Sequence, residues 1–172
     1  MMAERKTVHK WFWVWDFEKE ERWLNEMALA GWALVSVGWC RYTFEASEPG
    51  EYTVRLEMHG YDPEYVDFMA QARAEYVGRV LQWLYFRKRA EDGSFDIFSD
   101  IDSRISHIDR IHKLVFALAM LNLGAGLLNF GVNHGGFNVG ILNLLVTSML
   151  MYGLGRLREK KESLSRDRML YE

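Results

Sequence analysis

The sequence has few of the residues that build covalent or catalytic frameworks: Cys40 is its one cysteine among 172 residues. A single cysteine excludes an intrachain disulfide and a cysteine-based zinc cluster, and it favours a reducing compartment. The five histidines are scattered without an HExxH arrangement, so no metal site is expected. A Walker loop, a GxSxG elbow and a GxGxxG motif after a strand are also absent. We therefore expect no catalytic residues, no cofactor and no enzymatic activity.

A strong excess of one charge is lacking as well. The chain has 24 acidic and 21 basic residues, a formal net charge of -3 and a pI near 6.0. A face that binds a nucleic acid needs a large local excess of Lys and Arg. Direct binding to nucleic acid is therefore not expected.

Two segments lack charged residues altogether. Leu114 to Asn133 and Phe137 to Gly155 contain no Asp, Glu, Lys or Arg, and each is long enough to cross a hydrocarbon core of roughly 30 Å. Basic residues flank the outer ends of this pair and none lies between them, which predicts that both termini are cytoplasmic. We expect a transmembrane hairpin in the bacterial inner (cytoplasmic) membrane, with a turn at His134-Gly135-Gly136. Two buried core helices are the alternative.

Polar residues inside these segments need partners in lipid. Asn122 and Asn129 are seven positions apart and share a helix face, and Asn143 lies on the second segment at a comparable depth. We expect these asparagines to pack the two helices together. An oligomer contact, which would make the protein a homo-oligomer, and a conduction path are the alternatives.

An internal repeat precedes the hairpin. Sliding the chain by 42 positions aligns Met27 with Met69, Val35 with Val77 and Phe44 with Phe86. Residues 8–90 are therefore expected to form a cytoplasmic α+β head of two repeats, at about 8–49 and 50–90. Each repeat is predicted to fold as strand, helix, strand, strand, with an antiparallel sheet.

The expected boundaries follow from alternation and turn residues. The strands are predicted at 10–15, 32–37, 39–46, 52–59, 75–80 and 83–88, and the helices begin after Asp16 and Asp62. On the first helix Glu20 is expected to face water. An acidic connector and linker helix (91–112), the two-helix hairpin (114–157) and a charged cytoplasmic tail (158–172) complete the chain.

Alternation along the strands predicts two contrasting sheet faces. The core face should carry Phe12, Val14, Tyr42, Phe44, Val54, Leu56, Leu84 and Phe86. The opposite face should carry Trp11, Trp13, Trp15, Arg41, Thr43, Glu45, Arg55, Glu57, Trp83, Tyr85 and Arg87. Aromatic residues interleaved with charges indicate a ligand or partner face. The face could instead be covered by the other repeat, by a second subunit or by the bilayer surface.

Two resemblances follow from these residues. The strings WDFEKEERWLNEM and EPGEY, within residues 8–112, resemble a bacterial family known only as a domain of unknown function, in which such a head precedes hydrophobic spans. That resemblance implies no established activity, but it implies a gene neighbourhood with PadR-type repressors. The tandem architecture is also similar to GyrI-like ligand-binding domains, which implies a cleft for lipophilic cations at Trp11, Trp13, Trp15, Trp83, Tyr85 and Glu57.

The leading hypothesis is a non-enzymatic, membrane-anchored regulatory module whose head docks a PadR-type transcriptional regulator. A sensor of a small amphipathic ligand is one alternative. A structural subunit of a membrane oligomer is the other.

Overall fold

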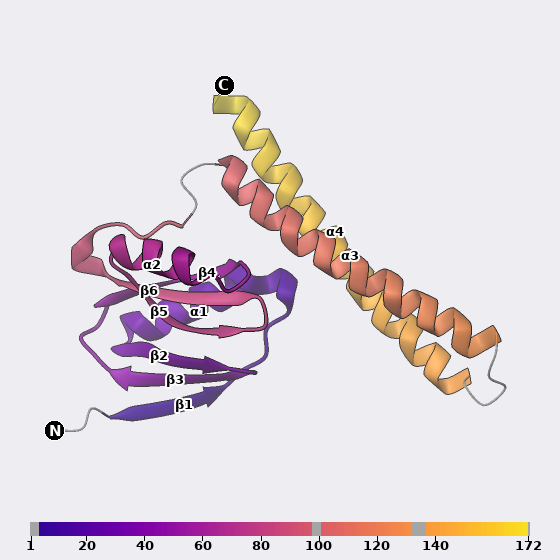
Figure 1. Ribbon diagram of the computed structural model, residues 1–172, viewed down its shortest axis with the longest axis horizontal. Helices are drawn as coiled ribbons and strands as arrows, with labels where there is room; N and C mark the ends of the chain where they lie inside the picture. The colour runs from indigo at the N-terminus through magenta and orange to yellow at the C-terminus, as the bar shows by residue number, and fades with distance from the viewer. Residues whose placement is uncertain (1–3, 98–100, 132–136, 172) are drawn as a thin grey trace. The chain divides into compact units, whose positions relative to one another are not determined.

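The computed structural model describes residues 4–97, 101–131 and 137–171, and it divides the chain into two compact units. The first unit, Met1–Ser99, is called the head, and the second, Asp100–Glu172, is called the hairpin. The head holds two antiparallel sheets of three strands each, and the hairpin consists of two long apolar helices (Figure 1). The predicted α+β class, with an apolar helix pair after a duplicated head, is confirmed.

Both repeats of the head contain the predicted order of elements. The first comprises β1 (Arg5–His9), η1 (Val14–Asp16), α1 (Phe17–Leu29), β2 (Trp32–Gly38) and β3 (Arg41–Ala46). The second comprises β4 (Tyr52–Met58), α2 (Pro63–Gln71), β5 (Ala74–Val80), β6 (Trp83–Arg89) and η2 (Ala90–Asp92). The strand order is β1-β3-β2 in the first sheet and β4-β6-β5 in the second, so corresponding strands occupy corresponding places.

The duplication extends to irregular features of the backbone. The register of β2 shifts between Leu34 and Ser36, and the register of β5 shifts between Tyr76 and Gly78, which lie 42 positions later. The second residue after each helix also has a positive φ, 83° at Gly31 after α1 and 62° at Arg73 after α2. Arg73 therefore adopts the left-handed conformation that a glycine adopts in the first repeat.

The predicted first strand is wrong. Residues 10–13 form a loop and residues 14–15 belong to η1, and the strand that pairs with β3 is β1, at Arg5–His9. Val8 pairs with Tyr42, whereas Glu57 pairs with Leu84, so the first strands of the repeats are offset by 49 rather than 42 positions. The first repeat therefore carries seven extra residues between its first strand and the common part of its helix.

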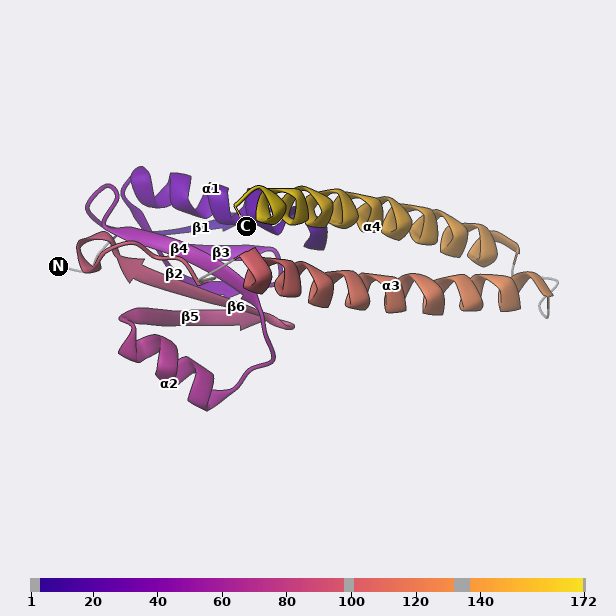
Figure 2. The same ribbon diagram turned by 90° about the horizontal axis from the view of Figure 1, so that it is seen from above.

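The second sheet lies between two apolar layers. On one face Val54, Leu56 and Tyr85 pack with Leu24 of α1 and with Phe44 of β3, among others. On the other face the core residues are Met69, Ala74, Leu84, Phe86 and Phe95. Figure 2 shows α1 and α2 on opposite sides of the head, as this arrangement requires.

The predicted distribution of residues over the two faces is therefore only partly right. The β4–β6 register places Leu56 opposite Tyr85 and Arg55 opposite Phe86. Paired residues in adjacent strands share a face. Val54 and Leu56 thus lie on the face opposite to that of Leu84 and Phe86, and both faces are buried.

The hairpin helices α3 (Ile101–Gly131) and α4 (Phe137–Tyr171) pack along each other (Figure 1). Each is long and apolar enough to cross a membrane, and only 22% of its most apolar window is buried. Leucines such as Leu121, Leu128 and Leu145 are exposed by 72, 66 and 63%. Helices of this kind expose far more apolar surface than core helices of a soluble protein do. The predicted turn at residues 134–136 lies outside the described residues.

The side chain of Asn122 bridges the two helices of the hairpin. The side-chain amide of Asn122 donates to the carbonyl oxygen of Asn143 and to Thr147 Oγ1, the latter at 2.9 Å. Gly126 lies close by, since a Cβ there would be 3.1 Å from Asn143 Cβ. Asn129, two turns further along α3, is half-buried.

Candidate binding surface

Three exposed tryptophans form a contiguous aromatic surface on the first repeat. Trp11, Trp13 and Trp39 are exposed by 52, 38 and 65%. Trp11 makes edge contacts with Trp39 and with Trp13, at ring-centroid distances of 5.9 and 5.3 Å. Trp13 stacks on the buried Trp15 at 5.2 Å. We call this row of four rings the tryptophan ladder.

A backbone hydrogen bond holds the loop that carries Trp11 and Trp13 beside the turn that carries Trp39. The amide of Lys10 donates to the carbonyl oxygen of Cys40 at 3.1 Å, which fixes the start of the loop 10–13 beside the β2–β3 turn. Cys40 itself adopts a positive φ of 53°, and this tight turn leaves Trp39 exposed at its tip. Trp13 then directly precedes η1, whose first turn is closed by the bond from Asp16 N to Trp13 O. Trp11, Trp13 and Trp15 thus lie in the segment that contains the seven extra residues of the first repeat, and Trp39 joins them from the β2–β3 turn.

Arg41 is the one charged residue of the predicted face that lies exposed near the ladder. It pairs with His9 on the outer face of the first sheet, next to Thr7 and Thr43. Glu45, on the same face, accepts from Arg5 Nε at 2.7 Å. This face is hydrophilic, and it adds basic residues beside the tryptophans.

The other predicted site residues are not part of this surface. Arg55 is 3.2 Å from Glu21 on α1, and Arg87 bonds Glu75 and the carbonyl oxygen of Leu34. Glu57 is buried and accepts from the Tyr65 hydroxyl on the side of α2, whereas Tyr85 is buried on the side of α1. Trp83 is half-buried against the α1 core. The structure therefore does not bring Glu57 and Tyr85 into one cleft with Trp11 and Trp13.

Sequence reasoning missed the most unusual polar group of the head. Glu20, predicted to face water, is 9% exposed, and its Oε1 accepts from the hydroxyls of Tyr42 and Tyr85 at 2.7 and 2.6 Å. Burial raises the pKa of Glu20 above its ordinary value, and the hydrogen bonds from Tyr85 and Tyr42 oppose that rise. The pKa values of both tyrosines are raised, chiefly by burial and then by the Glu20 charge.

The spacing of residues along α1 could have identified Glu20 as a buried residue. The buried residues of α1 are Phe17, Glu20, Leu24 and Ala28. These positions recur at intervals of three or four and share one helix face. A glutamate on that stripe indicates a buried carboxylate with specific partners.

Among the described residues, no three His, Cys, Asp or Glu side chains lie close enough together to hold a metal ion. The features in place are an exposed aromatic ladder, a buried carboxylate between the repeats, and a helix pair with the length and composition of membrane spans. They define a class of protein: a duplicated α+β head joined to an apolar hairpin.

The chain belongs to the family of proteins of unknown function DUF2812, whose match covers residues 16–120. The matched segment runs from the start of α1 into α3, and most of the tryptophan ladder precedes it. No curated protein and no solved structure matches the chain.

Proposed function

We propose that the chain is a non-enzymatic membrane-anchored binding module whose head docks a protein partner through the tryptophan ladder. The observation that carries this proposal is the exposure of Trp11, Trp13 and Trp39, with Trp11 in contact with both of the others. Soluble surfaces rarely leave such a cluster in water, and tryptophans are the residues most enriched among binding hot spots. The exposed Arg41, which follows Trp39 by two positions, favours a partner with an apolar pocket and an acidic group at its rim.

The anchor in this proposal is the hairpin. Its exposed leucines support insertion into lipid, and the absence of Lys and Arg between Leu114 and Gly155 supports an orientation with both termini cytoplasmic. The bacterial cytoplasmic membrane is the proposed location. A PadR-type transcriptional regulator is the proposed partner, because the sequence resemblance implies such a gene neighbourhood. Docking would hold the regulator at the membrane until a signal releases it.

The positions of Glu57 and Tyr85 favour docking of a protein over sensing of a small molecule. A cation cleft of the GyrI-like kind needs Glu57, Tyr85 and the tryptophans around one cavity. Glu57 and Tyr85 are instead buried on opposite faces of the second sheet. The ladder, in contrast, presents its rings outward and needs no cavity.

The test is an affinity purification of the full-length protein from its native membrane in mild detergent, with mass spectrometry of co-eluting proteins. We expect a PadR-type regulator, and we expect Trp13→Ala and Trp39→Ala each to reduce its recovery at least tenfold, because truncating an aromatic anchor costs about 2 kcal/mol or more. Leu81→Ala is the matched control, since Leu81 occupies the position of Trp39 in the second repeat and is 75% exposed.

A second readout uses the sole cysteine. Cys40 is half-buried and directly follows Trp39, so a docked partner should slow its alkylation by a maleimide. Recovery of the regulator with equal yield from Trp13→Ala and from Leu81→Ala would contradict docking through the ladder. An alkylation rate of Cys40 that does not change when the partner is added would also contradict docking through the ladder.

A further inference from the structure

We propose that a recess between α3 and α4 binds the headgroup of an anionic phospholipid, with His112 and Arg158 holding its phosphate. This site is separate from the ladder and concerns a different ligand. It rests on one part of the proposed function, that the hairpin spans a membrane.

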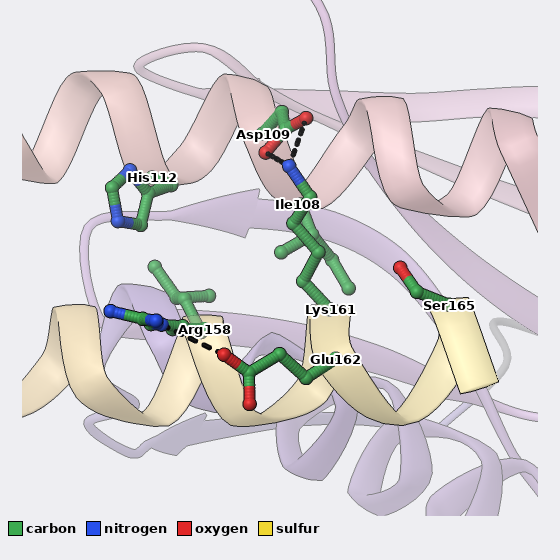
Figure 3. Close-up of a pocket in the computed structure, with 8 residues that line it drawn as sticks. Ile108, Asp109, His112, Arg158, Lys161, Glu162 and Ser165 are labelled. Atoms are coloured by element: carbon green, nitrogen blue, oxygen red, sulfur yellow. Dashed lines mark hydrogen bonds and ion pairs between the residues drawn. The ribbon is translucent and has the colours of Figure 1, made fainter.

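The recess is formed within the hairpin alone and has a volume of about 370 Å³. Its floor is formed by the apolar side chains of Ile108 and Leu157, which are buried, with 3 and 0% exposed. Its walls are polar: Asp109 and His112 come from α3, and Arg158, Lys161, Glu162 and Ser165 come from α4 (Figure 3). The recess therefore offers donors for a lipid phosphate above an apolar floor.

The depth of the recess matches the level of lipid phosphates. His112 lies two positions before Leu114, where the first uncharged segment begins, and Arg158 lies three positions after Gly155, where the second ends. Both side chains therefore lie just outside the expected hydrocarbon layer, which is where phosphate groups are found. Asp109, Lys161 and Ser165 follow at increasing distance from that layer.

The charged side chains are arranged differently at the two ends of the recess. Lys161 Nζ is 2.7 and 2.8 Å from the two carboxylate oxygens of Asp109, a bond that joins the helices at one end of the recess. At the other end His112 of α3 and Arg158 of α4 line the recess from opposite helices, and the Arg158 side chain lies along α4 (Figure 3). Arg158 donates through Nε to Glu162, a pair that is 77 and 57% exposed and is easily exchanged for a stronger acceptor.

The surrounding charge favours an anionic lipid. Residues 109–113 and 156–162 together contain six Lys or Arg and three Asp or Glu, a net of three positive charges with His112 neutral. Basic groups at this level attract anionic headgroups. A zwitterionic lipid would gain less from this excess.

The experiment measures lipid retention by native mass spectrometry of the full-length protein in maltoside detergent with added dioctanoyl phosphatidylglycerol. We expect one lipid per protomer, and we expect His112→Gln combined with Arg158→Gln to reduce retention at least fivefold. Arg158→Lys, which keeps the charge but loses the planar guanidinium, should give an intermediate value. Arg166→Gln, on the same helix but outside the recess, is the control and should retain lipid as the unmodified chain does.

Equal retention by the double variant and the control would overturn the proposal. Equal retention of dioctanoyl phosphatidylcholine would overturn its preference for an anionic lipid. If inorganic phosphate at the same concentration displaces the lipid, free phosphate is the ligand and the proposal fails. Extraction of the chain from membranes by carbonate would instead refute the spanning hairpin, so that the two failures are distinguishable.

Discussion

At the scale of single residues, Glu20 is the group that joins the two repeats. One carboxylate oxygen from α1 receives a hydroxyl of the first repeat, Tyr42, and a hydroxyl of the second, Tyr85. Burial of a carboxylate is costly, and the two hydroxyl donors offset part of that cost. The arrangement fixes the orientation of α1 against both sheets, because rotating the helix would leave the carboxylate without these donors.

The first residue-scale prediction concerns pH. The folded pKa of Glu20 is raised above its ordinary value of 4.5, so its favourable contribution to stability is full below about pH 4.5 and is lost as pH rises through the folded pKa. Glu20→Gln keeps an acceptor for both tyrosines without the charge. We therefore expect the variant to gain stability relative to the unmodified chain as pH rises from 4 to 7, by about 1.4 kcal/mol for each unit of the shift. The stability difference is measured by thermal unfolding in detergent, monitored by tryptophan fluorescence.

Glu26→Gln is the control for this measurement. Glu26 lies on the same helix and is exposed, so its substitution should leave the pH dependence of unfolding unchanged. A constant stability difference between Glu20→Gln and the unmodified chain over this pH range would show that Glu20 titrates normally in the folded state.

At the scale of elements, helix α1 covers the outer edge of strand β4. The Asn25 side chain accepts from Val54 N and donates to Val54 O, both at 2.9 Å, and Glu21 Oε2 accepts from Leu56 N at 3.0 Å. These backbone groups point away from β6, the only neighbour of β4 in its sheet. Helix side chains thus take the place of a further strand and protect an edge that could otherwise pair with another chain.

This arrangement predicts the result of removing the amide. Asn25→Ala leaves the Val54 N–H without its partner, while Val54 O keeps the bond from Arg55 Nη1 at 3.2 Å, so we expect a loss of about 1–3 kcal/mol in unfolding free energy. Hydrogen exchange should accelerate at the Val54 amide and much less at amides that bond to β6. Glu26→Ala, one position along α1, should change neither quantity. Unchanged exchange at Val54 would mean that Asn25 contributes nothing to the edge.

The elements also show where sequence reasoning reaches its limit. Turn residues and alternation located five of the six strands and the Asp62 cap of α2, whose carboxylate accepts from Glu64 N as predicted. The error came from the alternating tryptophans at 11, 13 and 15, which resemble a strand but belong to a loop and to η1. The actual strand, β1, is an exposed edge whose residues show little alternation. Local patterns cannot reveal such a strand, because only its pairing with β3 defines it.

The face assignment failed for a related reason. Strands β4 and β6 are separated by α2 and β5, so no short turn fixes their register. A change of one position in that register exchanges the two faces. The predicted face grouped Trp11, Trp13 and Trp15, but it did not include Trp39, which was assigned to a strand.

At the scale of the whole molecule, the duplication and the ladder together make the head asymmetric. The repeats share their sheet order and backbone irregularities, but the extra loop and Trp39 occur in the first repeat only. A head with two equivalent docking surfaces would bind two partners. This head offers one ladder, and we infer a single partner per chain.

The topology of the chain supplies the last prediction. The uncharged segments of the hairpin have basic residues at their outer ends only, from which we predict that the head and the charged tail are cytoplasmic. Cys40, the sole cysteine, is half-buried on the head and should react with a membrane-impermeant maleimide only after spheroplasts are permeabilised. A Cys40→Ser chain should give no signal, and His134→Cys in that background should react in intact spheroplasts, because residue 134 lies between the two segments. Labelling of Cys40 in intact spheroplasts would place the head outside and exclude docking of a cytoplasmic regulator.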